Sequence, residues 1–325
     1  MKHLRKGLPL LLILSLLLSG CRIHLPLPTR PETAPVTEAV TEPPATEPAP
    51  TPPPETEPPE TEPPVTEPTE PPPLDVELPD PEDGDFVRVL DYIPDIYVEL
   101  RYATDNNFTG QTIYRFNELW LRYGTVKKLV KVQEVLREHG LGLKVWDGFR
   151  PVAAQFDLWE VCPNPTYVAN PNGGYSTHSR GNTVDLTLVT SDGTELLMPT
   201  GFDDFSTKAN RNYSDVSQEA AQNARQLEQI MKENGFSSIH SEWWHFVDTQ
   251  SYSAETVFQP VGDLPYTGND GAVAFWTSDD DTQQLLCLIP AGEVFPVVAL
   301  NGDYVLVEYR DTLGYVESAL IQPAE

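Results

Sequence analysis

The pattern of hydrophobic and polar positions divides the chain into four parts. An almost unbroken apolar run from Leu8 to Leu18 follows a short basic N-terminus. Residues 22–83 then have too few apolar side chains to build a core. Apolar positions return with helical and strand-like spacing as far as about residue 256, and short β-like runs follow. The pattern therefore predicts boundaries that separate residues 1–21, 22–83, 84–256 and 257–325.

The third part mixes helices and strands without a regular βαβ repeat, which predicts an α+β fold. Ser217 is a plausible helix N-cap, and Gly140 and Gly235 stand where a helix C-terminus is expected. Pro151 is tolerated in a first helical turn. The spacing predicts helices over 126–139, 151–161 and 217–234, and strands over 86–102, 141–146, 183–190 and 238–247.

The fourth part has the texture of a small all-β domain. Short β-like runs alternate with turn signals over 270–325. Asn301 and Gly302 stand between the apolar runs 297–300 and 304–309, and this dipeptide strongly favours a hairpin. We therefore expect two ordered domains, the first α+β and the second all-β.

The N-terminal segment is typical of a secretory signal. Its apolar run is too short to span a bilayer as a mature helix. The run closes with Leu-Ser-Gly before Cys21, and this ending resembles a bacterial lipobox, in which the cysteine becomes the lipidated first residue. That resemblance implies an extracytoplasmic protein that is anchored to the bacterial cell membrane through Cys21.

Residues 22–83 are expected to be a disordered tether. Thr-Glu-Pro-Pro recurs there, for example at Thr41, Thr56 and Thr61. Proline at this density opposes helices and sheet ladders and favours extended polyproline II, and the glutamates repel one another. The tether is either a spacer that lifts the ordered part off the membrane or a linker whose length is immaterial. The formal net charge of −28 argues against a nucleic-acid partner, because phosphates would be repelled.

Four residues of the third part could carry metal chemistry. His178 and Asp185 are seven positions apart, and Glu242 precedes His245 by three. Imidazole and carboxylate ligands suit Zn²⁺, and a catalytic zinc takes three protein ligands and leaves a position open for water. A nearby carboxylate that is not a ligand can accept and donate protons. Each of these residues alone is also typical of a structural role, so the spacing by itself leaves the function open.

Residues 86–250 resemble the VanX-type D-alanyl-D-alanine dipeptidases, within the zinc D-Ala-D-Ala peptidase group that includes VanY-type D,D-carboxypeptidases. Four segments carry the resemblance. They are Ser176-x-His178-x-x-Gly181-x-x-x-Asp185, Glu242-Trp243-Trp244-His245, Asp147-Gly148-Phe149-Arg150-Pro151 and the segment from Tyr102 to Gly110. Thr183 stands where the first pattern commonly has alanine, a difference that could alter the pocket wall. The resemblance implies an α+β zinc peptidase (Hedgehog-like) fold.

The resemblance also implies a role for individual residues. One zinc ion per chain is bound by His178, Asp185 and His245. Glu242 acts as general base and then as general acid, and Arg150 stabilises the negative charge of the tetrahedral intermediate. The alternative for Arg150 is a structural ion pair with Asp147. Candidates for substrate contact are Ser176 and, for the substrate ammonium group, Asp147 and Asp203.

The fourth part resembles a bacterial SH3-like module. The resemblance depends on three short runs at 291–298, 302–307 and 314–316. It implies a small barrel that binds peptidoglycan or its peptides, and the alternative is a packing module without a ligand. Tyr304 stands where the hairpin of that module usually has tryptophan, which weakens the case for a ligand.

Three functions remain open from the sequence. The first is zinc-dependent hydrolysis of D-alanyl-D-alanine or a related D-amino-acid peptide, which the motifs favour. The second is a D,D-carboxypeptidase that trims peptidoglycan stem peptides, which an extracytoplasmic location favours. The third is a wall-binding lipoprotein without activity, and the retention of all three ligands, Glu242 and Arg150 argues against it.

Overall fold

The computed structural model describes residue 74 and residues 78–324. The predicted signal segment, Cys21 and most of the predicted tether lie outside the described residues. Within the described residues, no helix combines the length and the apolar character needed to cross a membrane.

A five-stranded sheet forms the centre of the α+β part. Its strand order is β2-β4-β5-β7-β6, and the pairs are antiparallel except for the parallel pair of β2 and β4. A separate two-stranded ladder joins β1 and β3. The strands are β1 Phe86–Arg88, β2 Tyr97–Val98, β3 Trp120–Arg122, β4 Leu141–Asp147, β5 Thr183–Thr190, β6 Phe236–Ser238 and β7 His245–Asp248.

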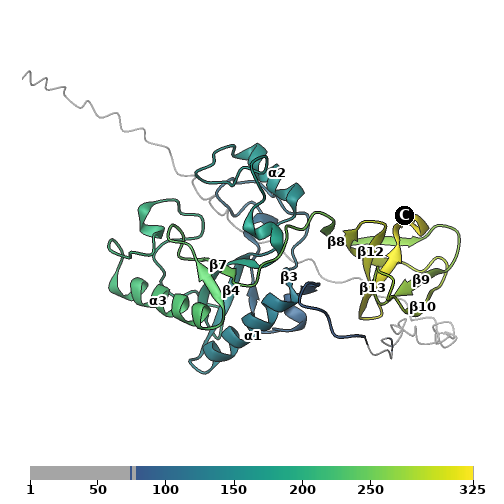
Figure 1. Ribbon diagram of the computed structural model, residues 1–325, viewed down its shortest axis with the longest axis horizontal. Coiled ribbons are helices and arrows are strands. Elements are labelled where there is room, and N and C mark those ends of the chain that lie inside the picture. Colours follow the sequence, from purple (N-terminus) through teal and green to yellow (C-terminus); the bar gives the residue numbers. More distant parts are fainter. Residues whose placement is uncertain (1–73, 75–77, 325) are drawn as a thin grey trace, which may run out of the picture. The chain divides into compact units, whose positions relative to one another are not determined.

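Three helices accompany this sheet, α1 Tyr123–Arg137, α2 Val152–Val161 and α3 Gln218–Glu233. Helix α1 buries one apolar stripe, which consists of Val126, Leu129, Val132 and Leu136. Helices α1 and α3 contact each other and the sheet. Figure 1 shows them on one side of β4 and β7, and α2 on the other side. The three predicted helices are therefore confirmed, although α1 begins three residues earlier than expected.

Local signals placed the helix ends correctly. The Ser217 hydroxyl oxygen accepts a hydrogen bond of 3.1 Å from the Ala220 amide, so Ser217 is the N-cap of α3. Gly140 and Gly235 follow α1 and α3 with φ angles of +68° and +89°, which glycine adopts without steric cost. Pro151 directly precedes α2, as its fixed φ favours.

Strand β5 is the best-predicted strand, and it is central to the sheet. Its bounds coincide with the predicted 183–190, and every side chain from Thr183 to Val189 is buried. Two predicted strands are wrong in extent. The predicted 86–102 strand is broken into β1, β2 and two short 3-10 turns, at Val89–Asp91 and Arg101–Ala103.

The other error concerns the predicted strand at 238–247, which is split between β6 and β7. The Trp243 amide donates a hydrogen bond to the Ala209 carbonyl at 3.1 Å, outside the sheet. Trp243 and Trp244 are also both buried, although consecutive strand residues face opposite sides of a sheet. Glu242 therefore lies in a connection between two strands.

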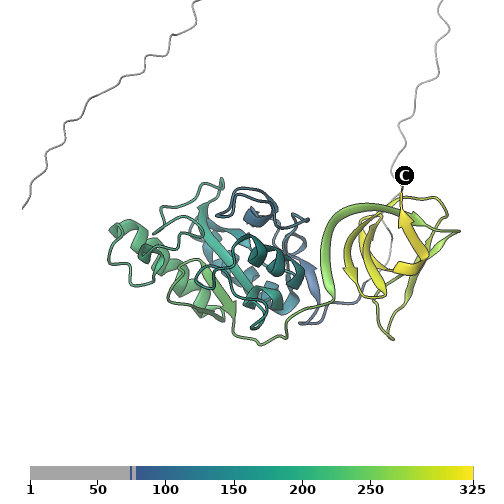
Figure 2. The same ribbon diagram turned by 90° about the horizontal axis from the view of Figure 1, so that it is seen from above.

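The C-terminal part forms a seven-stranded antiparallel sheet in the order β10-β9-β13-β12-β11-β8-β14. The predicted hairpin is present: Asn301 pairs with Tyr304, and Gly302 has a φ of +67°. Figure 2 shows β8 as a long, curved strand of this sheet. The strands are β8 Phe258–Gly268, β9 Val273–Trp276, β10 Leu285–Ile289, β11 Phe295–Asn301, β12 Tyr304–Tyr309, β13 Thr312–Glu317 and β14 Ile321–Pro323.

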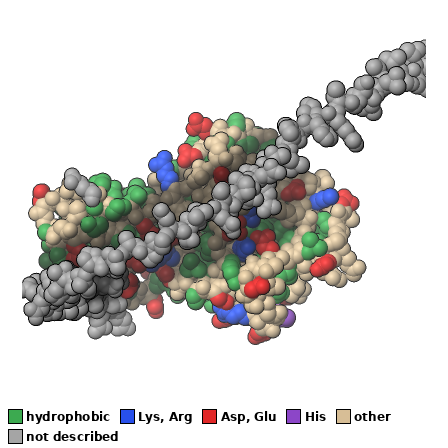
Figure 3. Space-filling view, turned by 180° about the vertical axis from the view of Figure 1, so that it is seen from behind, with side chains coloured by type: hydrophobic (Ala, Val, Ile, Leu, Met, Phe, Trp, Pro, Cys, Tyr) green, Lys and Arg blue, Asp and Glu red, His purple; other side chains and the backbone are tan. Residues whose placement is uncertain are grey.

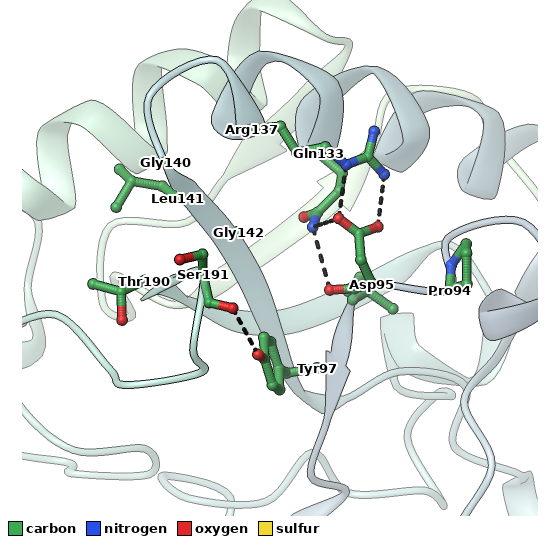
Figure 4. Close-up of a pocket in the computed structure, with 11 residues that line it drawn as sticks. Pro94, Asp95, Tyr97, Gln133, Arg137, Gly140, Leu141, Gly142, Thr190 and Ser191 are labelled. Carbon is green, nitrogen blue, oxygen red and sulfur yellow. Dashed lines mark hydrogen bonds and ion pairs between the residues drawn. The ribbon is translucent and has the colours of Figure 1, made fainter.

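The surface carries charges of both signs. Figure 3 shows one face, on which Lys and Arg side chains are scattered among Asp and Glu. A surface pocket of about 320 Å³ lies where α1 meets β2 and β4 (Figure 4). It is lined by the ion pair of Asp95 and Arg137 and by Gln133, and no predicted site residue borders it.

Candidate metal centre and substrate site

Three predicted ligands converge although they come from different elements. His178 lies in a 3-10 turn, Thr177–Arg180, while Asp185 belongs to β5 and His245 begins β7. Asp185 and His245 are direct partners in the antiparallel register of β5 and β7. One ligand atom from each of the three residues lies within 4.8 Å of the others, and all three residues are buried.

The short turn that carries His178 depends on its flanking residues. The Ser176 hydroxyl oxygen accepts a hydrogen bond of 3.3 Å from the His178 amide and caps the turn. Gly181 ends the turn with a φ of +73°, and a Cβ atom there would lie 2.5 Å from the Phe86 ring. Only glycine satisfies both conditions, which explains the Gly in the His-x-x-Gly motif.

Hydrogen bonding orients the His178 ring. Its Nδ1 atom lies 2.8 Å from the Gly148 carbonyl oxygen, which can only accept. Nδ1 therefore carries the proton, and Nε2, 3.3 Å from Asp185 Oδ2, is left free to bind a metal ion. On the other side, His245 Nδ1 lies 2.9 Å from Asp185 Oδ1.

The electrostatics of these residues fit a divalent cation. Burial opposes ionisation of Asp185, but the charges of His178 and His245 outweigh it and lower the pKa of this carboxyl group. Two neighbouring carboxyl groups show the opposite behaviour. Burial, and then the charge of Asp185, raise the pKa of Glu242 and of Asp203. The site thus holds a surplus of carboxyl groups, which a bound cation would offset, and the two imidazoles and one carboxylate suit zinc.

Glu242 stands beside the ligands without belonging to the cluster. Its Oε2 atom lies 3.6 Å from His245 Nδ1, and its side chain remains partly exposed. Arg211 fixes the connection that carries it, because its side chain donates to the carbonyl oxygens of Ile239 and His245 at 2.7 and 3.0 Å. Glu242 is therefore held at the open side of the cluster, where a proton acceptor is useful.

Arg150 is buried in a polar network that only partly follows from the sequence. Its Nη2 atom forms an ion pair with Asp147, and its Nη1 atom donates to Gln155 Oε1 at 2.9 Å. Its Nε atom lies 3.2 Å from the Tyr114 hydroxyl, and its guanidinium group sits over the Tyr102 ring at 5.0 Å. The predicted alternative for Arg150, an ion pair with Asp147, is thus present, and it also orients the guanidinium group within the site.

The three substrate-contact candidates occupy different environments. Asp147 is fully buried, and its oxygens accept from the Tyr114 hydroxyl, the Gly148 amide and Arg150. Ser176 is the cap of the His178 turn. Asp203 has a φ of +54°, unusual for a residue with a side chain, and its Oδ2 atom accepts from the Tyr102 hydroxyl at 2.8 Å. Burial raises the pKa of Asp203 to about 7.

Three residues that contact Arg150 were not predicted from the sequence to take part in the site. Tyr102 stands at the start of a segment that carried the resemblance, but no role was expected for it. Tyr114 and Gln155 belong to no motif, and nothing in the local pattern signals them. Tyr114 reaches Arg150 only because the segment before β3 packs against the end of β4, and Gln155 reaches it from the first turn of α2.

Comparisons with known proteins agree over this part of the chain. The family model Peptidase_M15, described as D-ala-D-ala dipeptidase, matches residues 82–261. The D-alanyl-D-alanine dipeptidase of Escherichia coli (strain K12) is 39% identical over 160 residues, which cover 49% of this chain and 82% of that protein. The dipeptidase of Enterococcus faecium is 35% identical over 169 residues, which cover 46% and 84%. That of Streptomyces coelicolor is 33% identical over 199 residues, which cover 54% and 96%.

Solved structures give weaker likenesses. A variant of the vancomycin resistance D,D-pentapeptidase VanY, in complex with Zn(II), is 17% identical with a TM-score of 0.28, and the match covers 41% of this chain and 75% of that one. The vancomycin resistance D,D-dipeptidase VanXYg, in complex with a D-Ala-D-Ala phosphinate analog, is 16% identical with a TM-score of 0.23, and the match covers 62% and 82%.

Proposed function

The chain belongs to the D-Ala-D-Ala dipeptidase family, and we propose on this basis that it hydrolyses D-alanyl-D-alanine with one zinc ion per chain. The observation that carries the proposal is the convergence of His178, Asp185 and His245 within 4.8 Å, with Glu242 beside them. His178, Asp185 and His245 would hold the ion. When bound, zinc supplies Lewis acidity, which polarises the scissile carbonyl group and makes the attacking water more acidic.

Glu242 moves the protons of this reaction. Its carboxylate accepts a proton from the attacking water, whose oxygen adds to the scissile carbonyl carbon. It then donates that proton to the leaving amine as the C–N bond breaks. Its raised pKa suits both steps, because a group that titrates closer to neutral pH accepts and releases a proton readily.

Arg150 stabilises the charge that develops on the carbonyl oxygen. Its guanidinium group is already held by Asp147, Gln155 and Tyr114, so little reorganisation is needed when the charge forms. Asp147 Oδ1 accepts from the Tyr114 hydroxyl and the Gly148 amide, and Oδ2 pairs with Arg150. Because both of its oxygens are occupied, we propose that Asp147 orients Arg150.

Asp203 is the proposed partner of the substrate ammonium group. It accepts from the hydroxyl of Tyr102, whose ring lies under the Arg150 guanidinium group. Among the described residues, no Lys or Arg side chain forms an ion pair with it. A bound ammonium group would stabilise the ionised carboxylate and offset the burial that raises its pKa. Ser176, which caps the His178 turn, remains a proposed substrate contact.

The wider setting of the enzyme is also proposed. The peptidase domain spans 84–256, and an SH3-like domain spans 257–325. The SH3-like domain would bind peptidoglycan or its peptides. The seven-stranded C-terminal sheet is compatible with such a barrel. The lipobox-like end of the signal segment supports an extracytoplasmic protein anchored through Cys21. In that location a D,D-carboxypeptidase that trims stem peptides is the alternative function.

Hydrolysis of two substrates tests the proposal. The chain without its first 21 residues, supplied with zinc, is given free D-Ala-D-Ala or a peptidoglycan pentapeptide that ends in D-Ala-D-Ala. Hydrolysis of the dipeptide alone is the expected result. Cleavage of the pentapeptide alone would favour the carboxypeptidase, and hydrolysis of neither would contradict both.

A further inference from the structure

A row of aromatic rings leads from the substrate site to the surface. Tyr102 and Phe108 meet edge to face at 6.4 Å, and Phe108 and Phe205 do so at 5.2 Å. Phe205 and Tyr167 are stacked at 4.5 Å. The rings come from three segments that are far apart in the sequence, so the row is created by the tertiary structure.

The burial of the rings shows the direction of the row. Tyr102 is 3% exposed, whereas Phe205 is 38% and Tyr167 is 45% exposed. Tyr102 is the inner end, because Arg150 lies over its ring and Asp203 accepts from its hydroxyl. Phe108 lies between the buried ring and the two exposed rings. The row therefore runs outward from the group proposed to bind the substrate ammonium.

Each outer ring is also joined to the site through its own segment. Phe205 follows Asp203 by two residues. Tyr167 lies two residues before Ala169, whose carbonyl oxygen accepts a hydrogen bond of 2.7 Å from Gln155. Gln155 in turn binds Arg150. Phe205 is thus linked to the carboxyl group proposed to bind the substrate ammonium, and Tyr167 is linked through Gln155 to Arg150, the proposed oxyanion-stabilising residue.

We propose that Phe108, Phe205 and Tyr167 form an aromatic clamp that closes the site beyond the amino-terminal end of a bound dipeptide. A longer peptide has another residue attached at the nitrogen that Asp203 would bind, and this residue must pass where the three rings meet. The clamp therefore determines substrate length and restricts the enzyme to free dipeptides. This inference rests on the proposed function and names the residues that set its length specificity.

The arrangement favours a closed wall over an open subsite. A subsite for a longer peptide or a sugar requires ring faces that are free to contact the ligand. Here the rings contact one another instead: Phe205 stacks on Tyr167 and meets Phe108 edge to face. Opening these contacts should create space without removing any group that binds the metal or the ammonium.

The test compares Phe205→Ala, Tyr167→Ala and the double variant with the unchanged protein. The matched control is Phe156→Ala, because Phe156 on α2 is 43% exposed and has no ring partner among the described residues. For each protein, kcat/KM is measured with D-Ala-D-Ala and with tripeptides that end in D-Ala-D-Ala. Phe205→Tyr and Tyr167→Phe retain the ring contacts and serve as conservative variants.

We expect the ratio of tripeptide to dipeptide kcat/KM to rise by about tenfold or more in the double variant, and to a smaller extent in each single variant. The control and the conservative variants should keep the original ratio. An unchanged ratio in folded alanine variants overturns the clamp while the dipeptidase function stands. A fall in tripeptide cleavage overturns it in favour of a subsite, and an unchanged protein that cleaves no dipeptide refutes the proposed function and the clamp together.

Discussion

Arg150 donates a hydrogen bond of 2.9 Å from its Nη1 atom to Oε1 of Gln155, a fully buried side chain on α2. The Nε2 atom of Gln155 donates onward to the Ala169 carbonyl. Gln155 therefore holds one terminal nitrogen of the guanidinium group, while Asp147 pairs with the other. No motif points to this residue, yet it joins α2, the segment after α2 and the proposed oxyanion-stabilising group.

Replacing Gln155 by leucine should reduce kcat by about tenfold to a hundredfold, because a misplaced guanidinium group loses its alignment with the developing charge. KM should change little, since the side chains proposed to bind the substrate ammonium group and the metal ion are unchanged. Steady-state kinetics with D-Ala-D-Ala measures this division between kcat and KM.

Gln133→Leu is the matched control for that change. Gln133 is a buried glutamine on α1 that accepts from the Leu143 amide and lies outside the site. Both variants should lose about 1–3 kcal/mol of the free energy of unfolding, because each leaves buried polar groups without a partner. Only Gln155→Leu should lose kcat, and an equal loss in both variants would mean that Gln155 acts through stability alone.

Replacing Glu242 by glutamine should lower kcat by about two to four orders of magnitude, because the amide can no longer accept and return a proton. Zinc content should stay at one ion per chain, since Glu242 is not one of the three proposed ligands. Kinetics and metal analysis of the same preparation test both statements. Glu138→Gln, a change at an exposed glutamate after α1, should leave both unchanged. Full activity in the Glu242 variant would remove the catalytic assignment.

Removing the metal with a chelator should lower the thermal unfolding temperature as well as abolish activity. Asp185 is buried between two histidines, and a cation that binds only the folded protein adds to its stability. Zinc added back should restore both properties. The His178→Ala variant should show no stabilisation by zinc, and an unfolding temperature insensitive to zinc in the unchanged protein would contradict the assigned ligands.

Acid should weaken the ion pair of Asp95 and Arg137, which lies outside the proposed active site in the pocket of Figure 4. The hydrogen bond from Arg137 outweighs burial and lowers the pKa of Asp95 from 3.8 to about 2. A carboxyl group whose pKa is lower in the folded state stabilises the protein above its unfolded pKa, and this contribution is lost as the pH falls through the folded pKa. The contribution of Asp95 should therefore be constant at neutral pH and disappear between pH 3.8 and about 2.

Urea unfolding of the unchanged protein and of Asp95→Asn across this range measures the effect. The difference in the free energy of unfolding between the two proteins should be small, because the ion pair is partly exposed, and should shrink as the pH falls below 4. A difference that grows on acidification would have the wrong sign. Activity at neutral pH should be equal in both proteins, since no site residue lines this pocket.

The sequence by itself determined the features that depend on neighbouring residues. Helix ends follow from Ser217, Gly140 and Gly235, and the C-terminal hairpin follows from Asn301 and Gly302, because caps and tight turns are set by local backbone preferences. The three candidate metal ligands were also proposed from sequence, through short motifs whose resemblance to a family supplied what spacing alone did not, and the structure brings them together.

The tertiary structure decided everything that depends on residues meeting across the fold. It placed Asp185 opposite His245 in the register of β5 and β7, and it put Glu242 in a connection where the apolar pattern predicted a strand. It joined Tyr114 to Arg150 and brought together the rings of the clamp from three segments. These contacts leave no trace in local periodicity, because they depend on how strands pair and loops pack rather than on the preferences of adjacent residues.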